Sequence, residues 1–195
     1  MDQLWYFLLY SFLGFLLETG YACLVGGDPD RKCLLLLPLC PVYGLGVCAV
    51  LLLPGWVLRS VPALVLLGGL TATAVEYGVS LLYQKLFSVS FWNYAGYPWN
   101  LDGRVCLPFS LAWGLLLVPA VRLVHPWAAR FIPLIPAPVS WAVLAALLSD
   151  LLVSSLVLRR TGDTRRLRWY RLRPGERSAA PEPGGGQAKK QPRSL

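Results

Sequence analysis

The chain has 195 residues, of which 56% are hydrophobic and only 14% are charged. Ordinary soluble domains carry about 25% charged residues, so this composition excludes a typical soluble protein and indicates a membrane protein. The formal net charge is +8, and 11 of the 18 Lys and Arg residues lie between Arg159 and Arg193. A nearly uncharged body with a basic end favours contact with anionic lipid or control of membrane topology, and we expect no nucleic-acid partner.

Five apolar segments are long enough to cross a membrane, for which about 20 residues are needed. These predicted spans cover residues 4–25, 34–58, 61–86, 105–124 and 134–158. The sequence therefore predicts an all-α fold, a polytopic membrane helical bundle of about five transmembrane helices formed by residues 1–158. Residues 159–195 are rich in Arg, Pro, Gly, Ser and Gln, and we expect them to form a disordered basic cytoplasmic tail.

Positive charge predicts the orientation, because Lys and Arg favour the cytoplasmic side of a membrane. With the basic tail inside, five crossings give a multi-pass plasma-membrane protein whose N-terminus is outside and whose C-terminus is cytoplasmic. The other residues that this orientation places inside are Arg31, Lys32, Lys85 and Arg104. The second span contains Pro38, Pro41 and Pro54, and if it were re-entrant the parity of the crossings would change.

Three acidic residues fall within the predicted spans, namely Glu18, Glu76 and Asp150. A charged side chain at the membrane centre costs about 2.5–3.5 kcal/mol, so such residues usually face a bundle interior or a water-filled cavity. With a rise of about 1.5 Å per helical residue, all three lie about 10–15 Å from the cytoplasmic ends of their spans. The alternative for each is a protonated structural residue that is hydrogen-bonded to a neighbouring helix.

The cytoplasmic start of the second span has a broken helical pattern at the same depth. Pro38 and Pro41 release backbone groups, and irregular backbone at membrane depth is tolerated only inside the protein or beside a cavity. Tyr43 also fits plain helix packing beside its neighbouring glycines. The residues predicted to form a polar cavity in the cytoplasmic half of the bundle are Glu18, Glu76, Arg104, Cys40, Pro41 and Tyr43.

Residues 91–106, FWNYAGYPWNLDGRVC, place turn and hydrogen-bonding chemistry between two apolar spans. The aromatic residues of 91–99 are explained as an aromatic belt at the membrane surface. In the following NLDGR, Asn100 and Arg104 are predicted to be working residues at the rim of the cavity. Gly103 is predicted to be the turn that directs Arg104 inward, where it would pair with one of the acids.

Five short motifs occur in a fixed order: YSFLGFLLE (10–18), CPVYGLG (40–46), VEY (75–77), FWNYAGYPWNLDGRVCL (91–107) and HP (125–126). Together, over about residues 4–130, they resemble a family of bacterial membrane proteins described as "putative ABC-transporter type IV" permeases. The resemblance implies an integral membrane transport permease with no established substrate. The residues that match the family pattern are Glu18, Glu76, Asn100, Gly103 and Arg104. Asn93 and Asp102 exchange an amide and a carboxylate relative to that pattern, so neither is expected to act as an obligatory carboxylate.

A transport permease is the first functional hypothesis. The sequence has no GxxxxGK[ST] phosphate-binding loop, so ABC-type transport would require a separate ATPase subunit. Transport coupled to a proton gradient through Glu18 or Glu76 is the other energy source considered. Because the chain allows only a small bundle, a homo-oligomer that encloses a full pathway is a further possibility.

Two other classes remain open. One is a small membrane enzyme or accessory protein that acts on lipid or a lipid-linked substrate at the cytoplasmic face. The sequence contains no recognisable catalytic motif and no metal-ligand set to support a reaction, and we expect no metal and no cofactor. The other is a scaffold whose basic tail binds anionic lipid or another protein.

Overall fold

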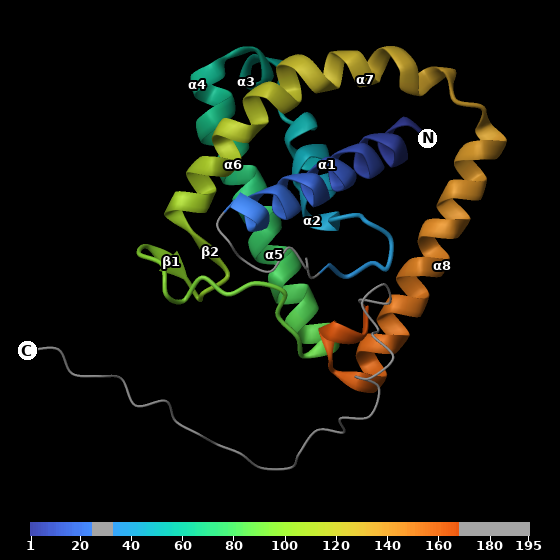
Figure 1. Ribbon diagram of the computed structural model, residues 1–195. Coiled ribbons are helices and arrows are strands. Elements are labelled where there is room, and N and C mark those ends of the chain that lie inside the picture. The colour runs from blue at the N-terminus through green and yellow to red at the C-terminus, as the bar shows by residue number, and fades with distance from the viewer. Residues whose placement is uncertain (25–32, 168–195) are drawn as a thin grey trace, which may run out of the picture.

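The computed structural model describes residues 1–24 and 33–167 (Figure 1). The predicted cytoplasmic residues Arg31 and Lys32, and the predicted tail from residue 168 onward, lie outside these described residues. The elements are α1 (Asp2–Leu24), α2 (Pro41–Leu51), α3 (Gly55–Arg59), α4 (Val61–Ala63), η1 (Leu64–Gly68), α5 (Gly69–Phe87), β1 (Asn100–Leu101), β2 (Val105–Cys106), α6 (Leu107–Pro119), η2 (Ala120–Val124), α7 (His125–Phe131), η3 (Ile132–Leu134), α8 (Ala137–Thr161) and η4 (Thr164–Leu167). The chain is mostly helical, as the sequence predicts.

Four helices of the described part are long and apolar enough to cross a membrane. They cover Asp2–Leu24, Val61–Phe87, Leu107–Leu134 and Ala137–Thr161, with lengths of 23 to 28 residues. At about 1.5 Å per residue each exceeds the hydrocarbon thickness of about 30 Å. A membrane protein is therefore the reading that the described structure supports, although the predicted count of five long helices is not confirmed.

The difference between the five predicted spans and the four long helices lies in the second predicted span, residues 34–58. Its longest helix, α2, has only 11 residues, which at about 1.5 Å per residue is half of a membrane thickness. Pro41 opens α2, where a missing N–H costs little, and Pro54 separates α2 from the short α3. In Figure 1 the chain nevertheless passes through α2 to α3 and α4 at the far end of the molecule.

The third long helix, which corresponds to the fourth predicted span, extends beyond its predicted end at residue 124. Residues 125–133, predicted to be a joint, continue the helix as α7 and η3 up to Leu134. A π-helical turn, η2, directly follows Pro119, and Pro126 lies in the first turn of α7. A wider turn and a proline at a helix start are both compatible with continuation, so neither proline ends the helix.

Close packing of α1 on α2 sets the centre of the molecule. A Cβ atom on Gly14 would overlap the Tyr43 ring, and one on Gly44 would overlap the Ser11 hydroxyl and the Phe7 backbone. The absence of side chains at both glycines lets the two helices approach closely, as small residues do in membrane bundles. This contact fixes where the polar side chains of α1 and α2 meet.

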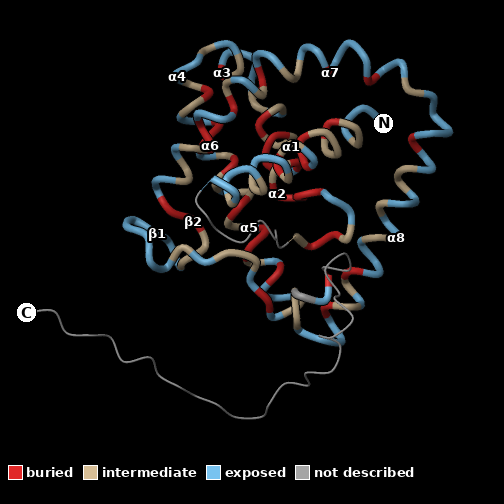
Figure 2. Tube along the Cα trace, viewed as in Figure 1, coloured by how far each residue is buried: buried red, intermediate tan, exposed pale blue. Residues whose placement is uncertain are grey.

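Helix α8 packs differently, because most of its large apolar side chains are exposed and only a few residues along it contact the bundle. Near its start, the Trp5 indole N–H donates to the Ser140 hydroxyl over 2.9 Å. Near its end, the fully buried Leu158 joins Val79 and Tyr83 of α5 in an apolar cluster. Figure 2 shows that α7 and most of α8 are exposed, whereas buried residues concentrate in α1, α2, α5 and α6.

The end of α8 also alters the predicted start of the tail. The helix runs to Thr161, Gly162 caps it with a φ of 61°, and η4 follows. Leu167 is buried in the same apolar cluster as Leu158. Residues 159–167, which the sequence assigns to a disordered tail, are thus partly helical and held against the bundle.

Candidate functional site

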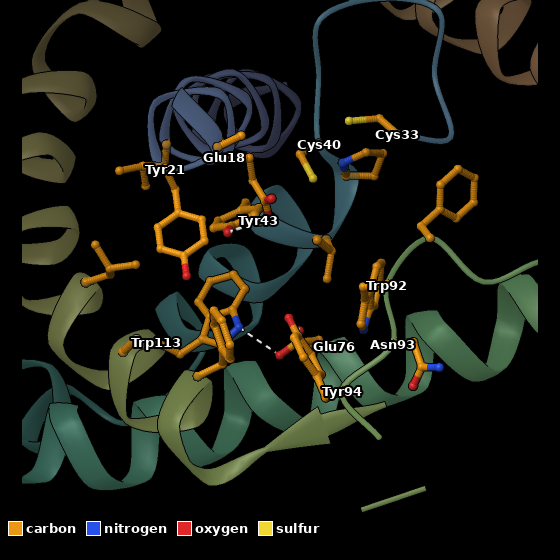
Figure 3. A pocket seen from close by; sticks show the side chains of 18 of the residues that line it. Glu18, Tyr21, Cys33, Cys40, Tyr43, Glu76, Trp92, Asn93, Tyr94 and Trp113 are labelled. Atoms are coloured by element: carbon orange, nitrogen blue, oxygen red, sulfur yellow. Dashed lines mark hydrogen bonds between the residues drawn. The ribbon is translucent and has the colours of Figure 1, made fainter. Parts of the chain in front are cut away.

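A cavity of about 970 Å³ opens at one end of the bundle. It lies between the last turns of α1, the segment before α2, the middle of α5, the loop 91–97 and the start of α6 (Figure 3). Five of the eight site residues predicted from the sequence line it, namely Glu18, Cys40, Pro41, Tyr43 and Glu76. These five residues thus line one cavity, and the functional role predicted for them stays a prediction.

Glu76 is the most deeply placed acid, with only 5% of its surface exposed. Its Oε2 accepts a hydrogen bond of 2.9 Å from the Trp113 indole N–H, and its Oε1 accepts one of 3.0 Å from the Tyr94 hydroxyl. A carboxylate can accept about four hydrogen bonds, so two donors leave accepting capacity for a ligand in the cavity. Helix α5, helix α6 and the loop after α5 each contribute one residue to this group.

The Tyr94 hydroxyl is a permanent donor in this arrangement. Burial raises the pKa of Tyr94 above its usual value, and the nearby Glu76 carboxylate raises it further. Both effects disfavour a phenolate, because a second negative charge beside Glu76 would be poorly solvated. The Tyr94 hydroxyl therefore stays protonated and remains a donor to Glu76.

Glu18 stands on α1 at the other side of the cavity and is half-buried. Its Oε1 accepts a hydrogen bond of 2.9 Å from the Tyr43 hydroxyl. The Tyr43 ring lies 4.6 Å from the Trp113 ring, centroid to centroid, so it stands between the two acids (Figure 3). Tyr43 thus combines both readings made from the sequence, since it packs against Gly14 and also lines the site.

Cys40 and Pro41 set the direction of α2 at the cavity wall. Cys40 is the residue before the helix, and its backbone N–H donates to the Ser11 carbonyl of α1 over 2.9 Å. Both residues are buried. The N–H that Pro41 lacks is one that no helix uses at its first position, so the break before α2 leaves no unpaired donor there. Their contribution to the site is positional.

The NLDGR segment forms a tight hairpin and does not line the cavity. Strands β1 and β2 pair Leu101 with Val105, and the Arg104 N–H donates to the Leu101 carbonyl over 2.9 Å. The two turn residues, Asp102 and Gly103, have φ values of 53° and 66°. Positive φ at both positions is the type I′ geometry that an Asp-Gly pair favours. Gly103 is therefore the turn residue, as predicted.

Asn100 stabilises the same loop. Its side-chain amide donates to the carbonyls of Tyr97 and Ala95 over 2.8 and 3.4 Å, and its oxygen accepts the Gly103 N–H over 3.0 Å. These contacts satisfy the Asn100 amide locally, and the side chain is exposed away from the cavity lining. The position predicted as a working residue is a loop-stabilising one in the structure.

Arg104 corrects the most specific sequence prediction, an ion pair with one of the acids. Its guanidinium instead contacts Ser80 over 3.4 Å, hydrogen-bonds Gln84, and lies 5.8 Å from the centre of the Tyr77 ring. All three partners lie on α5, outside the cavity lining. The type I′ turn rotates the residue after Gly103 onto the outer side of α5, and a sequence pattern does not show this rotation.

Most of the aromatic residues of the stretch 91–99 belong to the cavity wall, and their predicted role as a belt at the membrane surface stays a prediction. Phe91, Trp92, Tyr94 and Tyr97 all contribute to the cavity wall. The Trp92 indole N–H donates to the Arg104 carbonyl over 2.9 Å and so ties the loop to the hairpin. Trp99, by contrast, is 82% exposed and fits the surface role predicted for the whole stretch. The loop folds back over the cavity because the hairpin returns the chain to α6.

Asp150, the third acid predicted at the same depth, is not part of the cavity lining. Its two oxygens accept the backbone N–H groups of Leu36 and Leu37, each over 3.0 Å, and one also accepts the Ser154 hydroxyl over 3.1 Å. Asp150 thus attaches the irregular segment before α2 to α8. This is the structural role that the sequence left as an alternative.

Sequence reasoning missed the aromatic partners on α6. Trp113 was hidden inside an apolar span, where a tryptophan is not by itself informative, and Phe109 stacks on Tyr94 with 4.9 Å between ring centroids. The available signal was the single polar atom of Trp113, since a buried indole N–H requires an acceptor. Glu76 is one of the few acceptors in the predicted spans.

Comparison with known proteins identifies the family. The sequence model of the family described as "Putative ABC-transporter type IV" matches residues 5–157. Because the match covers most of the chain, the protein belongs to this family, as its motifs indicate. The match extends past residue 130 and includes most of α8, which the motif resemblance had left outside. No curated protein and no solved structure matches the chain.

Proposed function

We propose that this ABC-transporter-related membrane protein is a transport permease whose cargo enters the cavity between Glu18 and Glu76. The observation that carries the proposal is Glu76, a carboxylate that is 5% exposed, lies on a membrane-length helix and faces a cavity of about 970 Å³. Such a residue in a membrane usually marks a pathway for an ion or a substrate. The site residues of the proposal are Glu18, Cys40, Pro41, Tyr43 and Glu76, with Trp113 and Tyr94 added by the geometry.

The cavity would open toward the cytoplasm of a plasma-membrane protein. Support comes from the distribution of positive charge over the two ends of the molecule. The cavity end carries Lys85 and Arg104 and, at the end of α8, Arg159 and Arg160, whereas the opposite end carries three Arg residues on α3, η2 and α7 (Figure 1). This argument does not depend on whether residues 34–58 cross as one helix.

Energy would come from a separate ATPase subunit, in keeping with the ABC-transporter relationship of the family. The 195 residues contain no phosphate-binding loop. The exposed hairpin of β1 and β2 stands at the proposed cytoplasmic end, where Trp99 and Leu101 are 82% and 59% exposed. The exposed side chains of Trp99 and Leu101, next to Arg104, form the surface that we propose for contact with the ATPase.

A cell experiment separates transport from lipid chemistry. Cells that lack the protein would be complemented with the native chain, Glu76→Gln or, as a control, Asp2→Asn, and their contents and medium would be profiled for metabolites and lipids. Transport predicts that at least one compound is redistributed between cells and medium with its total amount conserved, only with the native chain and the control. A changed total amount of a lipid and its product, without redistribution, would overturn the proposal in favour of an enzyme.

The ATPase is tested by a second measurement. The native protein, purified in lipid nanodiscs from its host, should retain an ATP-hydrolysing subunit, and Trp99→Glu should release it. Transport that continues without that subunit and follows an imposed proton gradient would replace the ATPase with coupling through the two glutamates.

A further inference from the structure

We infer that the cavity takes an amphiphilic organic cation, with an ammonium head beside Glu18 and Glu76 and a single hydrocarbon chain in an adjoining groove. This inference names the cargo class of the proposed permease and therefore rests on that function. Three features of the described residues carry it: the sign of the charge in the cavity, the aromatic character of its wall, and a second, apolar hollow that shares four lining residues with the first.

The cavity is acidic. Two carboxylates line it, and its described lining contains no Lys, Arg or His. Arg104, which the sequence predicts to pair with one of the acids, is directed onto Ser80 and Gln84 of α5. The partners of the two acids are neutral donors, namely Tyr43, Tyr94 and Trp113. A buried carboxylate that has only neutral partners favours a cation and disfavours phosphate or sulfate groups.

The wall is aromatic. The rings that line the cavity are Tyr21, Tyr43, Tyr83, Phe91, Trp92, Tyr94, Tyr97, Phe109 and Trp113. Ring faces attract cations within about 6 Å, most strongly for tryptophan, and such cages are typical of sites for alkylated ammonium groups. A metal cation is a poor match, because hard cations require several oxygen ligands at short distance and this cavity offers chiefly carbon.

A smaller hollow of about 280 Å³, the apolar groove, adjoins the cavity. The two share Leu17, Tyr43, Trp113 and Leu116. The other residues of the groove are Tyr10, Leu13, Gly14, Leu16, Val47, Leu117, Pro119, Ala120 and Val124. The groove runs between α1, α2, α6 and η2, so the chain of a molecule bound at the acids can extend from the cavity along the helices.

The groove has little to offer a polar ligand. Among its side chains only the hydroxyls of Tyr10 and Tyr43 and the indole N–H of Trp113 are polar, and they already donate to the Ala120 carbonyl, to Glu18 and to Glu76. Its remaining surface is aliphatic or aromatic, which favours hydrocarbon through loss of water from both surfaces. Tyr43 and Trp113 stand at the junction, where a ligand changes from charged head to apolar chain. The two hollows together thus match one amphiphile better than two separate ligands.

Binding can be measured on the complete protein in nanodiscs of uncharged phosphatidylcholine. The probe is radiolabelled decyltrimethylammonium, and binding to empty nanodiscs is subtracted. Competitors are unlabelled decyltrimethylammonium, tetramethylammonium, which has the head alone, and decyl sulfate, which has the chain with an anionic head. We expect saturable binding that the first competitor removes at lowest concentration and that decyl sulfate leaves unchanged. Competition by decyl sulfate at the same concentration would overturn the charge argument.

Single variants test the acids. Glu18→Gln keeps an oxygen acceptor for Tyr43, Glu76→Gln keeps one for either Tyr94 or Trp113, and both variants lose the charge. Each should weaken decyltrimethylammonium binding about tenfold or more, as loss of a charged contact typically does. The exposed acid Asp2 provides the matched control, and Asp2→Asn should bind as the native chain does. If Glu76→Gln fails to fold, Glu18→Gln, whose carboxyl is half-buried, still decides the matter. Native affinity in a folded Glu18→Gln protein would contradict the inference.

A groove variant tests the chain. Ala120→Phe places a ring in the apolar groove while keeping the backbone carbonyl that Tyr10 contacts. It should reduce decyltrimethylammonium affinity to that of tetramethylammonium and leave the latter unchanged. Leu152→Phe on the exposed face of α8 is the matched control. Equal weakening of both ligands, or of neither, would overturn the assignment of the chain to the groove.

The outcomes separate this inference from the proposed function. If cells expressing the native chain redistribute only anionic or uncharged compounds, and the nanodiscs bind no cationic amphiphile, the protein is a permease with a different cargo. If the nanodiscs bind the cation but no compound is redistributed, the protein binds amphiphilic cations as ligands and the proposed transport function is wrong.

Discussion

The cavity end and the α8 side of the molecule are built in contrasting ways. Around Glu76, three separate elements meet through two hydrogen bonds of 2.9 and 3.0 Å to one carboxylate. Along α8, by contrast, large apolar residues such as Trp141 and Leu152 are 61% exposed. Hydrogen bonds to a buried carboxylate hold the cavity walls together, whereas α8 presents an apolar surface suited to lipid. Substitutions at the cavity should therefore reduce stability and ligand binding together. Substitutions on α8 should change stability without changing ligand binding.

Glu76→Ala should have the largest effect. It leaves the Trp113 indole and the Tyr94 hydroxyl without an acceptor in a buried site, which should lower the free energy of unfolding by about 2–5 kcal/mol. Denaturant titration in detergent micelles, followed by tryptophan fluorescence, measures the loss. Glu76→Gln, which keeps an acceptor, is the control and should lose less than half as much. An Ala variant as stable as the native chain would show that these hydrogen bonds do not hold the cavity together.

Gly44→Val should come next. The added side chain would overlap Ser11 and Phe7, so α1 and α2 must move apart at a cost of about 1–3 kcal/mol. Cavity ligand binding should fall with stability, because Tyr43 and Glu18 lie on these two helices. Gly78→Ala, on α5 at a position where a Cβ would meet open space, is the control and should be neutral in the same unfolding assay. A neutral Gly44→Val would mean that close helix contact is not needed.

Asp150→Ala tests the connection of α8 to the bundle. It removes the acceptor for the Leu36 and Leu37 N–H groups, and we expect a loss of about 1–2 kcal/mol because these groups are partly accessible to water. Hydrogen exchange of residues 34–38 should increase while ligand affinity at Glu76 is retained. Loss of binding at unchanged stability would place Asp150 in the functional site after all.

Arg104→Ala should have a smaller effect than an ion pair with Glu18 or Glu76 would give. Loss of its contacts with Gln84 and the Tyr77 ring should cost about 1 kcal/mol and leave cation binding within about threefold of native. Gln84→Ala serves as the comparison, because it removes one of the same contacts and should show part of the same loss. Binding that collapses in Arg104→Ala but not in Gln84→Ala would restore the predicted pairing with an acid.

Leu152→Ala should have the smallest effect, because the side chain is 61% exposed on α8. In nanodiscs we expect a change in unfolding free energy within about 0.5 kcal/mol. Cross-linking of a cysteine placed at the same position provides a second readout. A larger destabilisation together with efficient cross-linking between copies would show that this face of α8 packs in a homo-oligomer.

The membrane character of the protein and the polar surroundings of Glu18 and Glu76 could be predicted because they depend on the local sequence pattern. Long apolar runs leave few alternatives to helices that cross a bilayer, and a charge such as Glu76 within one must have a polar surrounding. Gly103 was predictable for the same reason, since an Asp-Gly pair favours one turn type. The break at Pro41 was visible as well, although its effect on the length of α2 was underestimated.

The partners of these residues could not be predicted, because they are set by rotations about helices and turns. Trp113 and Glu76 are 37 residues apart in sequence and meet only because α5 packs on α6. Arg104 is directed away from the acids by a turn whose type was predictable but whose placement against α5 was not. The same limit applies to residues 91–97, where an interfacial belt and a cavity wall use the same aromatic residues.

The sequence alone determined that this is a membrane protein and to which family it belongs. Apolar runs, a deficit of charge and short ordered motifs are properties of the chain that survive any arrangement of its helices. Only the tertiary structure decided that Glu18 and Glu76 share one aromatic cavity while Asp150 and Arg104 stabilise its surroundings. The physical reason is that a buried polar group must find a partner, and the identity of that partner depends on which helices lie side by side.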